Sequence, residues 1–269
     1  MEKQFPSNSL GKRLKSMLKV DLRRMFTTRL FYIMAGICLA APILILVMTT
    51  MMDGSVSVDP QTGAETIVHG FDSVWQIIGT VSGDSSAAAG GMSMTAMCNI
   101  NLLYFGLAVL VGLFVSADFK SGYAKNLFTV RARKSDYVIS KTLVCFMAAV
   151  LLFVLFFIGT LIGGAMSGLP FALDSLTVGN LVLCLLSKLL LTLVFVPIFL
   201  AVSVAAKQKT WLAIVGSGAI GMLLFMMIPA LTPLNATVMN AVLCLAGGVL
   251  FSVGLGAVSK VVLSRTALV

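Results

Sequence analysis

The sequence predicts an all-α polytopic membrane protein with six transmembrane helices, an N-terminal amphipathic interfacial helix and both termini in the cytoplasm. The 269 residues are 59% hydrophobic and only 11% charged, whereas soluble domains carry about 25% charged residues. This apolar excess is too large for a soluble core, and disorder would require low hydrophobicity and high charge. The apolar residues fall into six runs, each close to the roughly 20 residues that one helical span needs.

Residues 1–29 are predicted to contain a cytoplasmic amphipathic interfacial helix. Apolar residues recur there every fourth position and so share one helical face, while Lys and Arg fill the opposite face. Such a helix lies in the membrane surface, and its basic face attracts anionic lipids of the inner leaflet. Docking of a cytoplasmic partner is a compatible alternative. The apolar face consists of Leu10, Leu14, Leu18, Leu22 and Phe26, and is widened by Met17 and Met25.

Residues 30–269 are predicted to form one six-helix transmembrane domain. Pro42 and Pro197 lie inside the first and fourth spans, where proline bends a helix. Gly164 and Gly168, at the end of the third span, have the small-xxx-small spacing that lets two helices approach closely. The predicted spans are residues 30–52, 101–117, 142–166, 180–205, 211–228 and 238–259.

The outer loop, residues 53–98, is acidic and contains no Lys or Arg. Phe71, Val74, Trp75 and Ile78 share one helical face, which predicts a short helix on the outer membrane surface with Trp75 at headgroup level. A solvated acidic loop is the favoured role for its carboxylates, and a cation site is the alternative.

The distribution of Lys and Arg predicts the orientation. With the N-terminus in the cytoplasm, the segments before the first span, between the second and third, between the fourth and fifth, and after the sixth hold 18 of the 19 basic residues. The outer segments hold none, together with six of the ten acidic residues. This asymmetry is what the positive-inside rule describes.

The remaining cation, Lys188, lies inside the fourth span. Two expectations stand: its long side chain snorkels toward the outer interface, which is favoured, or it faces a polar cavity and serves function. Met222 and Met226 of the fifth span are candidates, with Lys188, for the lining of a translocation path, because Met adapts to varied apolar surfaces. Packing against lipid is the alternative for these two methionines.

The chain lacks the motifs of an enzyme or a nucleotide-binding protein. It contains no GxxxxGK[ST] phosphate loop, no HExxH and no GxSxG. Its five cysteines form no CxxC pair, and His69 is the single histidine, so neither a metal site nor a disulfide framework is expected. We therefore expect no catalytic residue, no cofactor on this chain and no nucleic-acid partner. An ion-motive transporter would need a membrane-embedded acidic residue, which the predicted spans lack.

The basic loop at residues 118–141 is long enough for a short helix lying across the membrane face, although a solvated positive-inside loop is the alternative. Gly122 is expected at a turn with positive φ. Asp118 is expected to fix the loop through a charge-assisted hydrogen bond to the cations around it, such as Lys120 and Lys125. The loop residues singled out for contact with a partner are Asp118, Gly122, Lys125, Asn126, Arg133, Lys134 and Tyr137.

This loop resembles that of the type-2 export permeases of ATP-binding-cassette (ABC) transporters, particularly the branch linked to peptide-antibiotic (lantibiotic) export and immunity. Members of that branch show an acidic residue at the end of span two, a small residue with Gly, then Lys-Asn-Leu, a Gly-x-x-basic segment and Tyr-x-x-Ser-Lys entering span three. Arg131 stands where the family often has Gly. The matching residues are Asp118, Ser121, Gly122, Lys125, Asn126, Leu127, Lys134, Tyr137, Ser140 and Lys141.

The resemblance implies that residues 30–269 are a permease domain and that loop 118–141 couples it to a cytoplasmic ATP-binding subunit. ATP and Mg would then be bound by that subunit, and this chain would not be an enzyme. Two permeases would pair, as a homodimer or heterodimer, in a bacterial plasma membrane and export a peptide, drug or other amphipathic substrate. The alternative is a non-transporting membrane assembly or sensor subunit that uses the outer loop 53–98.

Overall fold

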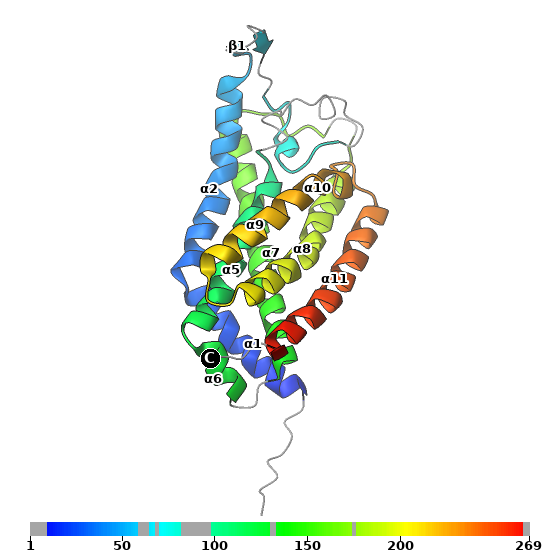
Figure 1. Ribbon diagram of the computed structural model, residues 1–269. Coiled ribbons are helices and arrows are strands. Elements are labelled where there is room, and N and C mark those ends of the chain that lie inside the picture. Colours follow the sequence, from blue (N-terminus) through cyan, green and yellow to red (C-terminus); the bar gives the residue numbers. More distant parts are fainter. Residues whose placement is uncertain are drawn as a thin grey trace, which may run out of the picture.

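A computed structural model describes residues 10–58, 65–67, 70–81, 98–129, 133–173 and 176–265. Long helices lie side by side in one bundle (Figure 1). One end carries the antiparallel strands β1 (Val56–Val58) and β2 (Glu65–Ile67), in which Val56 pairs with Ile67. The opposite end carries α1 (Leu10–Thr27) and α6 (Tyr123–Thr129). We call the end with the two strands the hairpin end, and the end with α1 and α6 the basic end.

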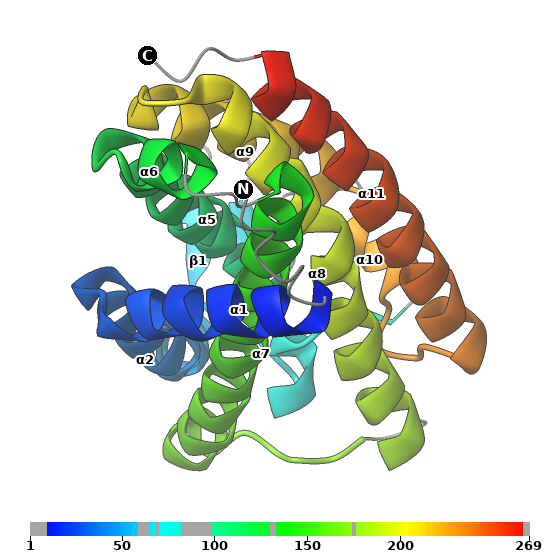
Figure 2. The same ribbon diagram turned by 90° about the horizontal axis from the view of Figure 1, so that it is seen from below.

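Helix α1 lies across the basic end of the bundle when this end is viewed from below (Figure 2). Met17, Asp21 and Met25 form its buried face, and Leu14, Leu18 and Leu22 are half-buried. Met17 and Met25 of the predicted apolar face are therefore buried against other helices of the protein, and the leucines of that face lie beside this buried strip. The interfacial position of α1 stays a prediction.

Five helices of the described chain are long and apolar enough to cross a membrane. They are α2 (Arg29–Met52), α5 (Leu103–Lys120, preceded by the 3₁₀ turn η2, Ile100–Leu102), α7 (Lys134–Ser167), α8 (Val178–Ala206) and α11 (Val238–Arg265). Helices α5 and α8 are the most buried, with 67% and 61% of their apolar windows inside the protein, against 22% for α2 and 17% for α11.

The predicted fifth span, residues 211–228, corresponds almost entirely to one helix that is short for a membrane crossing, so six spans are not confirmed. Helix α9 (Thr210–Phe225) has 16 residues, and α10 (Ile228–Leu231) has four. The 16 residues of α9 span about 24 Å, which is less than the thickness of the hydrocarbon core of a bilayer, about 30 Å. Pro229 explains why α9 and α10 are not one continuous helix, because a proline ring clashes with the carbonyl four residues earlier, here that of Phe225.

The close approach of α7 to α2 occurs at Gly159 and Gly163. A Cβ atom at Gly159 would lie 2.3 Å from the Leu39 carbonyl oxygen, and one at Gly163 would lie 2.8 Å from the Ile43 Cα. The small-xxx-small contact is therefore five residues earlier than predicted. Gly164 instead faces Val74, and Gly168 ends α7 with φ +73°.

The apolar part of the outer loop packs into the bundle and does not lie as a helix on its surface. Val74 and Ile77 of the 3₁₀ turn η1 (Val74–Ile77) have no exposed surface, and neither has Ile78, which follows the turn. The Trp75 indole N–H donates to the Phe171 carbonyl at 3.0 Å. The predicted surface helix is wrong in its placement, because its apolar side chains find protein neighbours.

Candidate functional site

Four charged side chains contact one another at the basic end of the bundle, and we call them the basic-end cluster. Asp21 and Arg24 come from α1, Asp118 from the end of α5, and Lys141 from the second turn of α7. The side chains of Asp21, Asp118 and Lys141 have no exposed surface, and that of Arg24 is 31% exposed. The cluster therefore joins three helices that are distant in sequence.

Lys141 is the centre of the cluster. Its Nζ lies 2.8 Å from Asp21 Oδ1 and 2.7 Å from Asp118 Oδ2. Ser140 donates to Asp21 Oδ2 at 2.7 Å, and Tyr137 donates to Asp118 Oδ2 at 2.9 Å. These charge-assisted bonds compensate groups that would be costly to bury alone.

Arg24 completes the charge balance of two carboxylates and two cations. One of its terminal nitrogens lies 2.7 Å from Asp118 Oδ1, a charge contact rather than an aligned hydrogen bond. Its guanidinium carbon lies 4.0 Å from the centroid of the Tyr123 ring, which favours a cation–π interaction. Burial, the largest single effect, lowers the pKa of Arg24, but the contact with Asp118 together with the charges of Tyr123 and Asp21 outweighs it, so the pKa is raised. Burial, with the charge of Asp21, raises the pKa of Tyr123.

The chain turns from α5 into α6 at Gly122, whose φ of +71° confirms the predicted positive φ. A Cβ at this glycine would meet nothing within 4 Å, so the requirement is conformational and not steric. Helix α6 is the short helix predicted in this loop. Its Ala124 is buried, whereas Lys125 and Asn126 are exposed.

The structure brings together some, but not all, of the predicted loop residues. Asp118 belongs to the basic-end cluster, Tyr137 donates a hydrogen bond to it, and Gly122 forms the turn beside it. Arg133 is exposed just before α7, and Lys134 donates to the Leu263 carbonyl of α11 at 2.8 Å. The predicted charge-assisted bond of Asp118 is present, but its partners are Lys141 and Arg24, whereas Lys120 and Lys125 are exposed.

The prediction missed Asp21, Arg24 and Lys141 as functional candidates. Local periodicity cannot show that residue 21 meets residue 141. One signal was present: Asp21 lies four residues from both Met17 and Met25, on the apolar side of a helix. A carboxylate in that position predicts a buried cationic partner.

A second buried cation, Lys188, lies in α8 toward the hairpin end. Its Nζ donates to Asn101 Oδ1 at 2.8 Å and to Thr232 Oγ1 at 2.9 Å. Its side chain has no exposed surface, so the favoured expectation of snorkelling is wrong. The Tyr104 hydroxyl donates to the Lys188 carbonyl at 2.7 Å, which fixes this turn of α8. We call Lys188, Asn101 and Thr232 the Lys188 node.

The two methionines predicted to share a path with Lys188 lie apart from it. Met222 is 70% exposed and Met226 is 75% exposed, on or just after α9. Both side chains lie on the exposed surface of the protein, so the structure does not bring them together with the Lys188 node. Their role in translocation stays a prediction.

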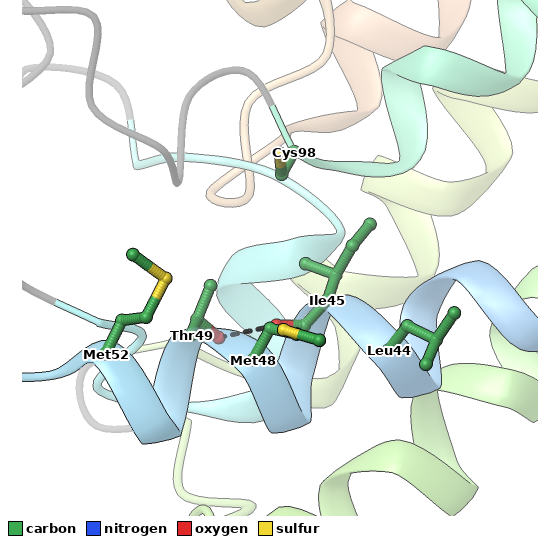
Figure 3. A pocket seen from close by; sticks show the side chains of 6 residues that line it. All are labelled: Leu44, Ile45, Met48, Thr49, Met52 and Cys98. Carbon is green, nitrogen blue, oxygen red and sulfur yellow. Dashed lines mark hydrogen bonds between the residues drawn. The ribbon is translucent and has the colours of Figure 1, made fainter.

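Two apolar hollows accompany these sites. A recess of about 160 Å³ lies at the hairpin end of α2, between Leu44, Met48 and Cys98 (Figure 3). The Thr49 hydroxyl beside it donates to the Ile45 carbonyl at 2.8 Å, so it is already partnered. A larger cavity of about 420 Å³ lies between α8, α10 and α11. Within the described ranges, no group of three or more His, Cys, Asp or Glu residues could hold a metal ion.

A family model described as "ABC-2 family transporter protein" matches residues 22–227. The match covers most of the chain, so the protein belongs to the ABC-2 family. Comparison with curated proteins and with solved structures gives no match. The family and the apolar helices define a multi-pass membrane protein. Its class is the permease component of an ABC transporter, which is not itself catalytic and works in general with an ATP-binding subunit.

Proposed function

We propose that this chain is the permease subunit of an ABC exporter whose separate ATP-binding subunit docks on α6 and the residues after it. The observation that carries the proposal is the mounting of α6. Its outward side shows Lys125 and Asn126, and Arg133 is exposed nearby, while the turn before it rests on the basic-end cluster. Force on α6 would therefore reach α5 through Asp118 and α7 through Lys141.

The buried ion pairs supply the stiffness that this transmission needs. If Lys141 moved away from one of its two carboxylates, a buried charge would lose its partner in the protein interior, which is costly. The same contacts include Asp21, so α1 would move together with α5 and α7. Closure of the ATP-binding subunits, with their ATP and Mg, would shift the equilibrium between conformations according to how well α6 binds in each.

The topology, assembly and cargo belong to the same proposal. We place α1 and α6 in the cytoplasm of a bacterial cell, as the one-sided Lys and Arg distribution favours, with α9 and α10 as the remaining crossing. The apolar faces of α2 and α11 are largely uncovered and are available to lipid or to a second permease. The resemblance to the lantibiotic branch favours an amphipathic peptide, or a drug of similar character, as the cargo. An assembly or sensor role for the outer loop 53–98 is the alternative; residues 59–64, 68–69 and 82–97 of this loop lie outside the described residues, and its described turn η1 packs into the bundle.

Affinity purification from native membranes in mild detergent tests the partnership. The expected result is a second subunit whose sequence contains a phosphate-binding loop, and ATP hydrolysis only when that subunit is present. Hydrolysis by the chain alone would contradict the division of labour.

Thiol labelling of intact cells tests the topology. Cys98 is half-exposed at the hairpin end, whereas the other four cysteines are buried. A membrane-impermeant maleimide should label native Cys98 from outside, and should not label a Lys125→Cys variant in which Cys98 is Ser. Labelling at position 125 from outside would overturn the proposed orientation.

A further inference from the structure

We propose that the cavity between α8, α10 and α11 is a binding site for an anionic amphiphile, whose hydrocarbon chain fills the cavity and whose acidic headgroup is recognised by Lys188. The site is part of this chain alone, so its existence does not depend on the proposed partnership with an ATPase. The assignment of the ligand as cargo, discussed below, does rest on that proposed function.

The lining of the cavity selects a hydrocarbon chain. Leu191 and Phe195 of α8, Leu231 of α10 and Leu243 and Phe251 of α11 are among its walls, and its volume is about 420 Å³. Ligand pockets typically measure about 300–1,000 Å³. Among the described residues, no charged or amide side chain lines it, so a polar ligand segment would lose its hydrogen bonds there.

The surroundings show how such a chain would enter. Two residues of the cavity wall have large exposed fractions: Met227, just before α10, is 61% exposed, and Leu243 of α11 is 52% exposed. These helices border the bundle on one side (Figure 1). Apolar side chains exposed on membrane-spanning helices face hydrocarbon, so the approach to the cavity is from the bilayer.

The charge next to the cavity selects the headgroup. Leu191 lies one helical turn after Lys188, and Thr232, which accepts from its ammonium, directly follows Leu231. The ammonium therefore lies at the hairpin-end side of the cavity.

The Lys188 ammonium is bound by neutral oxygens only. Asn101 and Thr232 accept from it, and across the described ranges no carboxylate forms an ion pair with it. A cation at membrane depth is costly and by default functional. A carboxylate or phosphate arriving with a hydrocarbon chain would supply the missing negative charge, whereas a cationic headgroup would be repelled.

Photolabelling of the purified chain in nanodiscs tests the site. The probes are a diazirine-bearing long-chain fatty acid and the long-chain alcohol with the same diazirine. Both should label the parent, with cross-linked peptides from α8 and α11, and the acid should label more strongly.

The matched pair Gly247→Phe and Gly254→Phe tests the cavity. A Cβ at Gly247 would meet Val194 at 3.9 Å, an ordinary contact, so the ring can fill the cavity without a backbone clash, whereas Gly254 faces open space on the same helix. Gly247→Phe should lower labelling by both probes roughly tenfold, and Gly254→Phe should not. Equal labelling of the two variants, or cross-links confined to other helices, would overturn the site.

Lys188→Met tests the headgroup preference. The variant should lower labelling by the acid roughly tenfold and leave labelling by the alcohol unchanged, and the unchanged alcohol signal also reports that the variant is folded. An equal loss of both probes, or no loss of the acid, would contradict recognition by Lys188.

The same chemistry can belong to a resident bilayer lipid or to exported cargo, and a last arm separates them. With the ATP-binding subunit reconstituted, ATP should leave acid labelling unchanged for a resident lipid and should reduce it for cargo. Absence of labelling with intact ATPase association would reject this site and leave the proposed function standing.

Discussion

The two lysines that are fully buried in the described part of the chain meet different kinds of partner. Lys141 lies between the carboxylates of Asp21 and Asp118, whereas Lys188 donates to the amide oxygen of Asn101 and the hydroxyl of Thr232. The first is part of a balanced set of charges that joins α1, α5 and α7. The second keeps an uncompensated positive charge beside an apolar cavity. The comparison teaches that one lysine holds helices together, while the other is suited to an incoming anion.

The largest effect is expected from removing the central cation. Lys141→Met would leave buried Asp21 without a cationic partner and Asp118 with Arg24 alone, and breaking a buried pair in this way costs about 3–5 kcal/mol. Denaturant or thermal unfolding in mild detergent measures the loss.

A charge-balanced variant is the control for this prediction. Lys141→Met combined with Asp21→Asn removes one cation and one anion and leaves Asp118 paired with Arg24, so most of the lost stability should return. If the double variant is no more stable than the single one, the cluster does not act as a balanced set.

A smaller loss of stability is expected at Lys188. Lys188→Met leaves Asn101 and Thr232 without their donor, which costs about 1–3 kcal/mol, but it also removes an uncompensated buried charge. The same unfolding measurement should therefore give a smaller loss than Lys141→Met. A larger loss at Lys188 would reverse the comparison between the two lysines.

The turn at Gly122 is expected to separate stability from coupling. A β-branched residue in the left-handed region costs about 1–2 kcal/mol, so Gly122→Val should lower stability by that amount and reduce substrate-stimulated ATP hydrolysis in reconstituted vesicles. Gly168→Val is the matched control, because Gly168 has φ +73° and open space but lies at the hairpin end. Equal loss of coupling in both variants would show that general destabilisation is the cause.

The smallest effect on stability is expected from the exposed cations. Lys125→Glu with Arg133→Glu should change stability by less than about 1 kcal/mol, yet weaken binding of the ATP-binding subunit in pull-down assays, most clearly at low salt. Lys207→Glu with Lys209→Glu reverses the same number of exposed charges in another turn. If the second pair abolishes coupling and the first does not, the docking loop is the wrong one.

Local patterns predicted much of the basic end and less of the hairpin end. The short helix α6, the turn at Gly122 and a polar bond of Asp118 follow from composition, glycine and charge within one loop. The partners of Asp118 do not, because they come from α1 and from the second turn of α7. Likewise Lys188 was expected to reach the interface, since sequence does not show that Asn101 and Thr232 lie beside it.

Two further differences between expectation and structure became clear only in three dimensions. The predicted fifth span, residues 211–228, largely coincides with α9, which already ends at Phe225 and is short for a membrane crossing on its own. The glycines at 164 and 168 have the spacing of a helix contact, but Gly159 and Gly163, with the same spacing, are the pair that faces α2. Spacing shows which residues share a helical face, but it does not show which helix that face meets.

Site-specific photo-cross-linking tests the central claim, that α6 is the docking site of the ATP-binding subunit. A benzophenone amino acid is placed at exposed position 126 of α6 or at exposed position 208 of the turn between α8 and α9, in membranes containing both subunits. The account predicts a cross-link from position 126 to the ATP-binding subunit that changes in yield on addition of ATP, and little or none from position 208. A cross-link from position 208 alone would contradict the account.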